Sequence, residues 1–224
     1  MLKLAIFDLD GTLLDTRRDI AEACNHALRM CGYPVRPLDE YNMLIGRGIG
    51  NLFRGALPED ARSAENIERM RGFFKSYYEL HICDFTEPYD GVYEMLDALS
   101  EAGIHLAVAS NKYQEGTERL VRHFFERYRF SCILGHREGK ALKPDPDILL
   151  EAMASFCGVS ADETAYCGDS DVDMQTGRNA GIRTIGATWG FRGRKELEEY
   201  DPWALADNPH EISSLLLSGI AEKQ

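Results

Sequence analysis

The sequence has no run of apolar residues long enough to cross a lipid bilayer, and it reaches the charged Asp8 too soon for a secretory signal peptide. Positive charge is also scarce, because 25 Lys and Arg face 37 Asp and Glu, which gives a net charge of -12. Nucleic acids and anionic membranes are recognised by basic surfaces. We therefore expect a cytoplasmic protein that binds neither a membrane nor nucleic acid; a monomer and a homodimer both stay open.

Paired cysteine motifs are missing as well. The six cysteines form no Cys-x-x-Cys pair and have no zinc-site spacing. They lie in apolar surroundings, as reduced thiols in the core of a cytosolic protein do, and are Cys24, Cys31, Cys83, Cys132, Cys157 and Cys167. Hydrophobic content of 44% and a length of 224 residues allow one ample domain, or a domain with a small insertion.

What is present begins with the apolar run 4–7, which is followed by Asp8, Asp10 and Gly11. Such a run predicts a buried parallel strand, and side chains two apart point to the same side of a strand. Two carboxylates at a buried strand end require a positive partner. A calcium-binding EF-hand loop starting at Asp8 would need Gly and Glu where Leu13 and Asp19 stand, so that alternative fails. A helix cap would explain one Asp and not both.

The rest of the chain divides into a helical part and an alternating part. Between 16 and 86 the periodicity predicts helices over 16–30, 38–44, 49–56 and 61–81, and no strand. From Pro88 onward we expect helices over 93–102, 117–128, 146–157 and 209–220, with Asp145 as the N-cap of the third, and strands over 104–109, 131–134, 164–167 and 183–187. A further helix follows the acidic stretch 168–173 and ends at 180. Alternation of this kind predicts a Rossmann-like α/β fold with a doubly wound parallel sheet.

Polar clusters follow four of the predicted strands or loops. In parallel sheets, ligands bind outside the carboxyl ends of the strands, so these clusters should meet at one edge. They are Asp8 and Asp10, Ser110 and Asn111, Lys143, and the group Asp169, Asp171 and Asp173. Several carboxylates at one edge repel one another without a cation, and oxygen ligands favour Mg²⁺. Lys143 would supply a fixed positive charge, while Ser110 and Asn111 could donate hydrogen bonds to phosphate oxygens.

In order and spacing these motifs resemble the four motifs of the haloacid dehalogenase-like superfamily of phosphohydrolases, over nearly the whole chain. The resemblance implies that Asp8 is the nucleophile that forms an aspartyl-phosphate, and that Asp10 is the general acid and then the general base. It also implies that Mg²⁺ is held by Asp8, the backbone carbonyl of Asp10 and Asp169, with Asp173 nearby. Asp171 could be a further ligand or only the N-cap of the next helix.

The same resemblance divides the chain into a catalytic core, residues 1–15 and 88–224, and an inserted helical cap, residues 16–87, with hinges near 15–16 and 89–90. The stretches 45–57 and 188–191 resemble phosphoglycolate phosphatases. Arg47, in the first of these, is the cap residue that we expect to bind a substrate carboxylate, since Arg binds carboxylates in bidentate fashion. An arginine in a solvated loop is the alternative.

These observations predict a Mg²⁺-dependent phosphatase of a small phosphorylated metabolite, with 2-phosphoglycolate first among the candidates. A sugar phosphomutase would use the same aspartyl-phosphate and return the group to another hydroxyl. Pyrophosphate or a nucleotide monophosphate is another candidate substrate. The remaining alternative, a non-catalytic protein that binds a phosphorylated ligand, is disfavoured because a binding protein needs no leaving-group acid beside the nucleophile.

Overall fold

The computed structural model describes residues 2–156 and 158–221. Its central feature is a parallel sheet of six strands in the order β5-β4-β1-β6-β7-β8. Strand β1 is central because its side chains are apolar on both sides and fully buried. The strands are β1 (Leu4–Phe7), β4 (His105–Tyr113), β5 (Phe130–His136), β6 (Thr164–Gly168), β7 (Arg183–Ala187) and β8 (Ala204–Ala206). The strand order reverses beside β1, which is where such sheets bind ligands.

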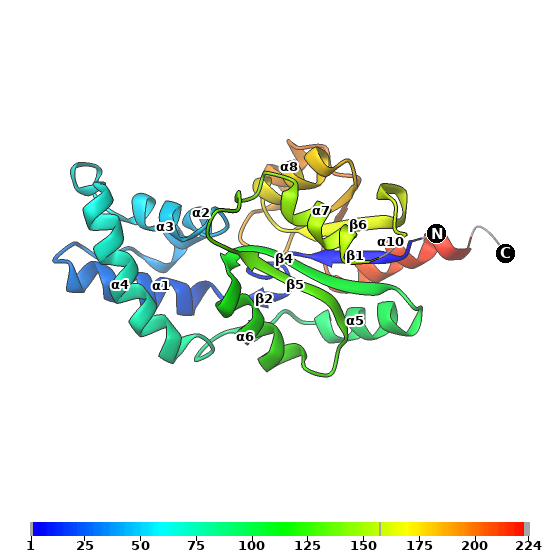
Figure 1. Cartoon of the computed structure of the whole chain (residues 1–224), viewed down its shortest axis with the longest axis horizontal. Coiled ribbons are helices and arrows are strands. Elements are labelled where there is room, and N and C mark those ends of the chain that lie inside the picture. The colour runs from blue at the N-terminus through cyan, green and yellow to red at the C-terminus, as the bar shows by residue number, and fades with distance from the viewer. Residues whose placement is uncertain (1, 157, 222–224) are drawn as a thin grey trace.

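Helices cover both faces of this sheet (Figure 1). One face carries α5 (Val92–Glu101), α6 (Gln114–Phe125) and α10 (Pro209–Ala221), and the other carries α7 (Asp147–Ala154) and α8 (Asp171–Ala180). Alternate residues of β1 serve the two layers, since Ala5 and Phe7 join the core beneath α5 while Leu4 and Ile6 pack with α7. A short helix, α9 (Arg194–Glu198), lies between β7 and β8. The predicted α/β fold with a doubly wound parallel sheet is confirmed.

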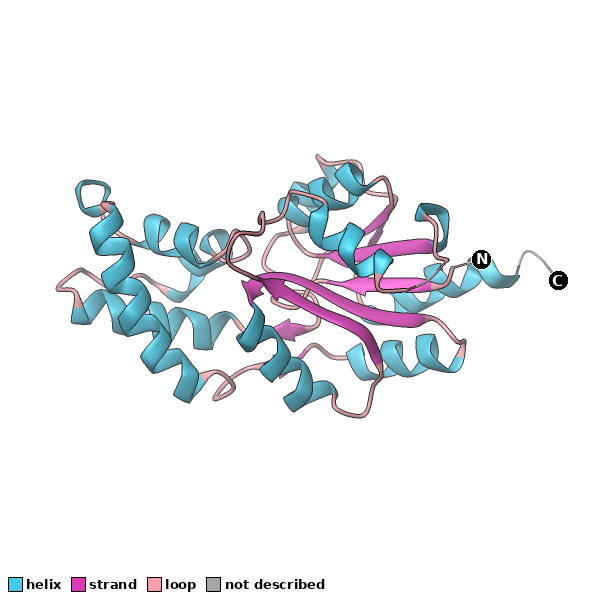
Figure 2. Cartoon of the chain, in the orientation of Figure 1, coloured by secondary structure: helices cyan, strands magenta, loops and turns pink. Residues whose placement is uncertain are grey.

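The segment after β1 is helical and extends to one side of the sheet (Figure 2). It contains α1 (Arg17–Met30), α2 (Tyr41–Leu44), α3 (Ile49–Ala56) and α4 (Ala64–His81), with 3₁₀ turns at Leu38–Glu40 and Glu59–Ala61. Helices α1 and α4 pack against each other (Figure 1). Helix α4 buries Met70, Phe74 and Tyr78, which are spaced four residues apart and so share one face.

A two-stranded antiparallel ribbon joins this helical segment to the sheet. Strand β2 (Leu14–Asp15) leaves the sheet and pairs with β3 (Glu87–Pro88), where the chain returns. Next to the ribbon, the buried carboxylate of Asp19 accepts hydrogen bonds from the backbone amides of Phe85 and Thr86. Strands of two residues carry no periodicity, so the sequence did not predict this ribbon.

Several element bounds differ from those expected. Strand β4 continues to Tyr113, because its end pairs with β5 at His136. Helix α6 therefore starts at 114, and it ends at 125. Helix α7 begins at Asp147 with Pro146 in the N-cap position, so the expected cap, Asp145, lies one residue outside it. The carboxylate of Asp145 instead accepts a hydrogen bond from the backbone amide of Asp147. Helix α7 ends at 154, and Cys157, near its predicted end, lies outside the described residues.

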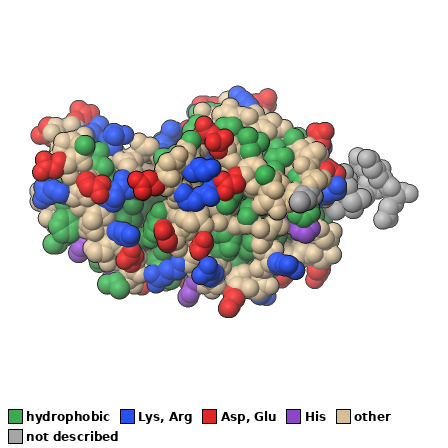
Figure 3. All heavy atoms as spheres, in the orientation of Figure 1, with side chains coloured by type: hydrophobic (Ala, Val, Ile, Leu, Met, Phe, Trp, Pro, Cys, Tyr) green, Lys and Arg blue, Asp and Glu red, His purple; other side chains and the backbone are tan. Residues whose placement is uncertain are grey.

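The five described cysteines are free thiols, of which Cys24 and Cys167 are buried. No helix within 2–156 and 158–221 is long and apolar enough to cross a membrane. On the face of the molecule in Figure 3, basic side chains are interspersed with acidic ones.

Candidate active site

Asp8 and Asp10 lie in the loop directly after β1, at the carboxyl edge of the sheet. The backbone amide of Asp8 donates to the carbonyl of Cys167, which holds the loop against the end of β6. Gly11 then turns the chain with φ +91°, a conformation that other residues rarely adopt. A Cβ atom at Gly11 would lie 2.3 Å from Asp169 Oδ2. Glycine is therefore required here both for the turn and for the close approach of a carboxylate.

Three acidic side chains converge at this edge: Asp8 follows β1, Asp169 follows β6, and Asp173 lies in the first turn of α8. One carboxylate oxygen from each of Asp8, Asp169 and Asp173 lies within 4.8 Å of the others, and all three residues are buried. Thr12 Oγ1 and the backbone amide of Phe191 donate to the two oxygens of Asp169, at 3.1 and 2.7 Å. Buried carboxylates this close need a cation, and an all-oxygen donor set suits a hard divalent ion. The residues present therefore fit Mg²⁺.

Asp173 is more fully engaged than the other two. Its Oδ1 accepts from Lys143 Nζ at 2.7 Å and from the hydroxyl of Tyr166 at 2.6 Å. Its Oδ2 accepts from the backbone amide and the hydroxyl of Ser170, in the capping box that starts α8. These contacts orient Asp173 toward Lys143 and leave Asp8 and Asp169 as the better donors for a metal ion.

Lys143 is the buried cation of the cluster, with its side chain 1% exposed. Its ammonium lies 2.9 Å from Asp8 Oδ1 and donates to Asp173 and to the hydroxyl of Tyr166. Burial acts to lower the pKa of Lys143, but the charges of Asp173 and Asp8 outweigh burial and raise it above its ordinary value. Lys143 therefore carries a permanent positive charge beside Asp8.

Burial acts to raise the pKa of all three carboxylates, but the net shifts differ. Desolvation raises the pKa of Asp8 to about 7, although the charge of Lys143 acts in the opposite direction. Desolvation, together with the charges of Asp173 and Asp8, also raises the pKa of Asp169 well above its ordinary value. Desolvation acts to raise the pKa of Asp173, but the charge and hydrogen bond of Lys143 lower it overall. A cation between Asp8 and Asp169 would offset the cost of ionising both.

Ser110 and Asn111 lie in the last part of β4, and both line the pocket in front of Asp8. The amide of Asn111 donates to the carbonyls of Gly46, at 2.9 Å, and Lys143, at 3.2 Å, and accepts from the backbone amide of Lys143 at 2.8 Å. Asn111 therefore joins the helical segment to the loop of Lys143. Ser110 Oγ accepts a hydrogen bond from the backbone amide of Lys112. The hydroxyl hydrogen of Ser110 remains available, so of Ser110 and Asn111 it is Ser110 that can donate to a phosphate oxygen.

Arg47 does not line the pocket in front of Asp8, although its neighbours Gly46 and Gly48 do. Its guanidinium pairs with the carboxylate of Asp171, and its side chain is 50% exposed. Asp171 is the first residue of α8, whose N-cap is Ser170, so the expectation that Asp171 caps this helix is wrong by one residue. The pair Arg47–Asp171 lies at the rim between the helical segment and the sheet, and neither residue lines the pocket. This arrangement does not support the predicted contact of Arg47 with a substrate.

Lys112 is a site residue to which the sequence analysis gave no role. It is buried, and its ammonium lies 3.0 and 3.1 Å from the two carboxylate oxygens of Asp10. Asp10 also accepts from the hydroxyl of Thr16 at 2.7 Å, so Thr16 occupies the N-cap position of α1 without capping it. A signal for Lys112 existed, because residues two apart in a strand point to the same side and Ser110 was already a candidate.

Comparison with known proteins shows to which protein family the chain belongs. A model of the haloacid dehalogenase-like hydrolase family matches residues 5–187. The chain is 32% identical to a phosphoglycolate phosphatase of Pseudomonas syringae pv. tomato, over 92% of this chain and 76% of that protein. It is 30% identical to a phosphoglycolate phosphatase of Agrobacterium fabrum, over 98% of this chain and 94% of that one.

A crystal structure of a predicted phosphoglycolate phosphatase from Haemophilus somnus superimposes with a TM-score of 0.87 at 27% identity, covering 96% of this chain and 97% of that one. The chain belongs to the haloacid dehalogenase-like hydrolase family. Within it, the predicted resemblance to the phosphoglycolate phosphatase-like family is confirmed, and so is the predicted enzyme class, a phosphoric monoester hydrolase.

Proposed function

We propose that the protein is a Mg²⁺-dependent phosphatase that hydrolyses a small phosphomonoester through an aspartyl-phosphate on Asp8. The observation that supports this most is the convergence of Asp8, Asp169 and Asp173 within 4.8 Å at the edge of a pocket that Asp10 also lines. Such a cluster combines a nucleophile, an acid-base group and donors for a divalent ion. A protein that only binds phosphate has no use for the first two.

In the first step, an oxygen of Asp8 attacks phosphorus and the bond from phosphorus to the ester oxygen breaks. A proton held at the carboxyl group of Asp10 passes to the leaving oxygen. In the second step, Asp10 takes a proton from a water molecule that attacks phosphorus, and the acyl-phosphate bond to Asp8 breaks. The products are an alcohol and phosphate, and both carboxyl groups return to their starting states.

Mg²⁺ would be held by Asp8, Asp169 and the backbone carbonyl of Asp10, and would neutralise charge on the phosphoryl oxygens. Lys143, 2.9 Å from Asp8, reduces the repulsion between the Asp8 carboxylate and an anionic substrate. Asp173 holds Lys143 in place. Ser110 donates to a phosphoryl oxygen.

We further propose that residues 16–87 act as a cap over a core formed by residues 1–15 and 88–224. In support, most apolar side chains of the pocket in front of Asp8 come from the helical segment, whereas its charged side chains come from the carboxyl edge of the sheet. The ribbon of β2 and β3 carries both connections, near the proposed hinges at 15–16 and 89–90. A cap that opens and closes would admit substrate and exclude water during phosphoryl transfer.

The names of the relatives suggest 2-phosphoglycolate as a substrate, and it is the reference compound for any comparison. A sugar phosphomutase, a pyrophosphatase or a nucleotidase would use the same residues. Release of free phosphate without a sugar bisphosphate distinguishes a phosphatase from a mutase. We propose, as expected from the sequence, that the protein is cytoplasmic and is a monomer or a homodimer.

An aryl phosphate assay tests the proposal. We expect phosphate release that requires Mg²⁺, is abolished in Asp8→Asn, and falls roughly 10²–10⁴-fold in Asp10→Asn, the usual loss when acid-base help is removed. The control is Asp97→Asn, an exposed carboxylate on α5 that pairs with Arg127. Unchanged turnover in Asp8→Asn, or turnover that persists in excess chelator, would contradict the mechanism.

A further inference from the structure

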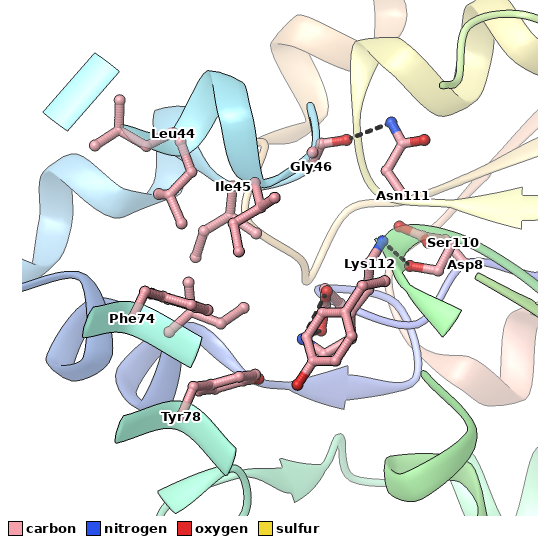
Figure 4. A pocket seen from close by; sticks show the side chains of 15 residues that line it. Asp8, Leu44, Ile45, Gly46, Phe74, Tyr78, Ser110, Asn111 and Lys112 are labelled. Atoms are coloured by element: carbon pink, nitrogen blue, oxygen red, sulfur yellow. Dashed lines mark hydrogen bonds and ion pairs between the residues drawn. The ribbon is translucent and has the colours of Figure 1, made fainter. Parts of the chain in front are cut away.

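The pocket in front of Asp8 has two unlike walls (Figure 4). The wall formed by the sheet is polar and contains Asp8, Asp10, Ser110, Asn111 and Lys112. The opposite wall comes from α1 to α4 and is apolar, with the side chains of Ile20, Leu44, Ile45, Ile49, Leu52 and Phe74. The space between the two walls opens directly in front of Asp8 and Asp10. When Asp8 attacks phosphorus in line, the leaving group lies on the side of phosphorus away from Asp8, toward the apolar wall.

The cations around this pocket already have partners. Of the described residues that line it, Lys112 is the cationic one, and both oxygens of Asp10 neutralise it. Arg47 pairs with Asp171 outside the pocket. Arg192, buried nearby, contacts Glu196 and donates to the backbone carbonyl of Met43. A carboxylate on the leaving group would therefore lack an unpaired cation and would lie close to Asp8 and Asp10.

Tyr78 adds one neutral donor to the apolar wall. Its hydroxyl is buried and has no hydrogen-bond partner among the residues that the structure describes. Tyr78 lies below the ammonium of Lys112, which is 5.0 Å from the centre of its ring. A neutral hydroxyl can bind an ether, carbonyl or hydroxyl oxygen, but it does not balance a full negative charge.

We propose that this enzyme selects phosphomonoesters whose leaving group is uncharged and largely apolar, and that 2-phosphoglycolate is a poor substrate. The inference rests on the proposed phosphatase function and specifies its substrate class. The phosphoryl chemistry belongs to the sheet. The apolar wall of the helical segment, and the lack of an unpaired cation among the described lining residues, decide which alcohol leaves.

Two substrates of nearly equal shape test this. Isobutyl phosphate has an isopropyl group where 2-phosphoglycolate has a carboxylate, so the two leaving groups contain the same number of heavy atoms. With the full chain and Mg²⁺, we expect kcat/KM to be at least about tenfold higher for isobutyl phosphate, the usual scale of discrimination by an apolar pocket. An equal or higher kcat/KM for 2-phosphoglycolate would overturn the inference and leave the phosphatase function intact. No release from these esters or from an aryl phosphate would instead contradict the phosphatase function itself.

A charge placed in the apolar wall gives the second arm of the test. Leu44→Lys introduces an unpaired ammonium at the end of α2, and Leu80→Lys makes the same change at an exposed position of α4. We expect Leu44→Lys to raise the ratio of kcat/KM for 2-phosphoglycolate over isobutyl phosphate at least about tenfold, and Leu80→Lys to leave the ratio unchanged. An unchanged ratio in folded Leu44→Lys would overturn the inference. Ile49→Lys repeats the test from α3 if Leu44→Lys does not fold.

Discussion

The ammonium of Lys112 lies 3.0 and 3.1 Å from the two carboxylate oxygens of Asp10, and both residues are buried. Lys112 lies in β4 and Asp10 in the loop after β1, and the parallel pairing of β1 with β4 brings them together. A buried pair of this kind is costly to break, because one charge then remains without a partner. Lys112 is therefore a positioning residue for the proposed acid-base group.

Lys112→Met is expected to lower kcat about tenfold to hundredfold, less than the roughly 10²–10⁴-fold attributed to acid-base catalysis as a whole. Without Lys112, the Asp10 side chain loses two hydrogen bonds and keeps the one from Thr16, so it is held less well in position for proton transfer. Steady-state kinetics separate this fall in kcat from any change in KM, and Lys112→Arg should recover part of it. The matched control is Lys140→Met, which removes an exposed lysine. A kcat within twofold of the wild-type value would refute the role.

The raised pKa of Asp8 predicts how stability depends on pH without metal. Its ordinary value is 3.8 and burial raises it to about 7, so between these values the folded state binds more protons than the unfolded state. The free energy of unfolding should therefore fall as the pH rises from about 4 to about 7. Asp169 shifts in the same direction and adds to the effect.

Thermal unfolding in excess chelator, measured from pH 5 to pH 8, checks this. Asp8→Asn should show a shallower decline, because the titrating group is gone. Added Mg²⁺ should raise Tm more at pH 8 than at pH 5, since protons compete with the metal for the carboxylates. Equal stabilisation by Mg²⁺ at both pH values would count against the site.

Asn111 joins the helical segment to the sheet through hydrogen bonds to Gly46 and Lys143. Asn111→Ala leaves the buried amide of Lys143 without its acceptor, and we expect a loss of about 1–3 kcal/mol in the free energy of unfolding. Urea titration measures it. Asn179→Ala removes a single exposed hydrogen bond to Pro144 and should cost less than about 1 kcal/mol. Equal losses in the two variants would show that the bridge contributes nothing.

Gly11→Ala separates backbone strain from the close approach of Asp169. A Cβ at Gly11 would lie 2.3 Å from Asp169 Oδ2, whereas Gly103 has a similar φ, +75°, and no atom within 4 Å of its Cβ position. Both alanine variants should lose about 1–2 kcal/mol through strain. Only Gly11→Ala should raise the Mg²⁺ concentration for half-maximal activity, about tenfold or more. A normal Mg²⁺ requirement in Gly11→Ala would contradict the assignment of Asp169 as a ligand.

Local patterns in the sequence predicted the sheet and most of the cluster. The apolar residues of β1 are buried on both faces, which requires a central parallel strand, and the polar residues after such strands must meet at one edge. Asp8, Asp169 and Lys143 therefore could be brought together by reasoning from strand ends alone. The ribbon of β2 and β3 could not be predicted from the sequence, because strands of two residues have no detectable periodicity.

The sequence by itself determined the fold and the edge of the sheet at which the acidic side chains meet, because these follow from apolar periodicity and from carboxylates at strand ends. Only the tertiary structure decided which charges pair: Lys112 with Asp10, Arg47 with Asp171, and Asn111 with the backbone of Gly46 and Lys143. The physical reason is that each partner lies on an element distant in the chain. Local sequence governs the conformation of a segment, whereas pairing depends on how the helical segment packs against the sheet.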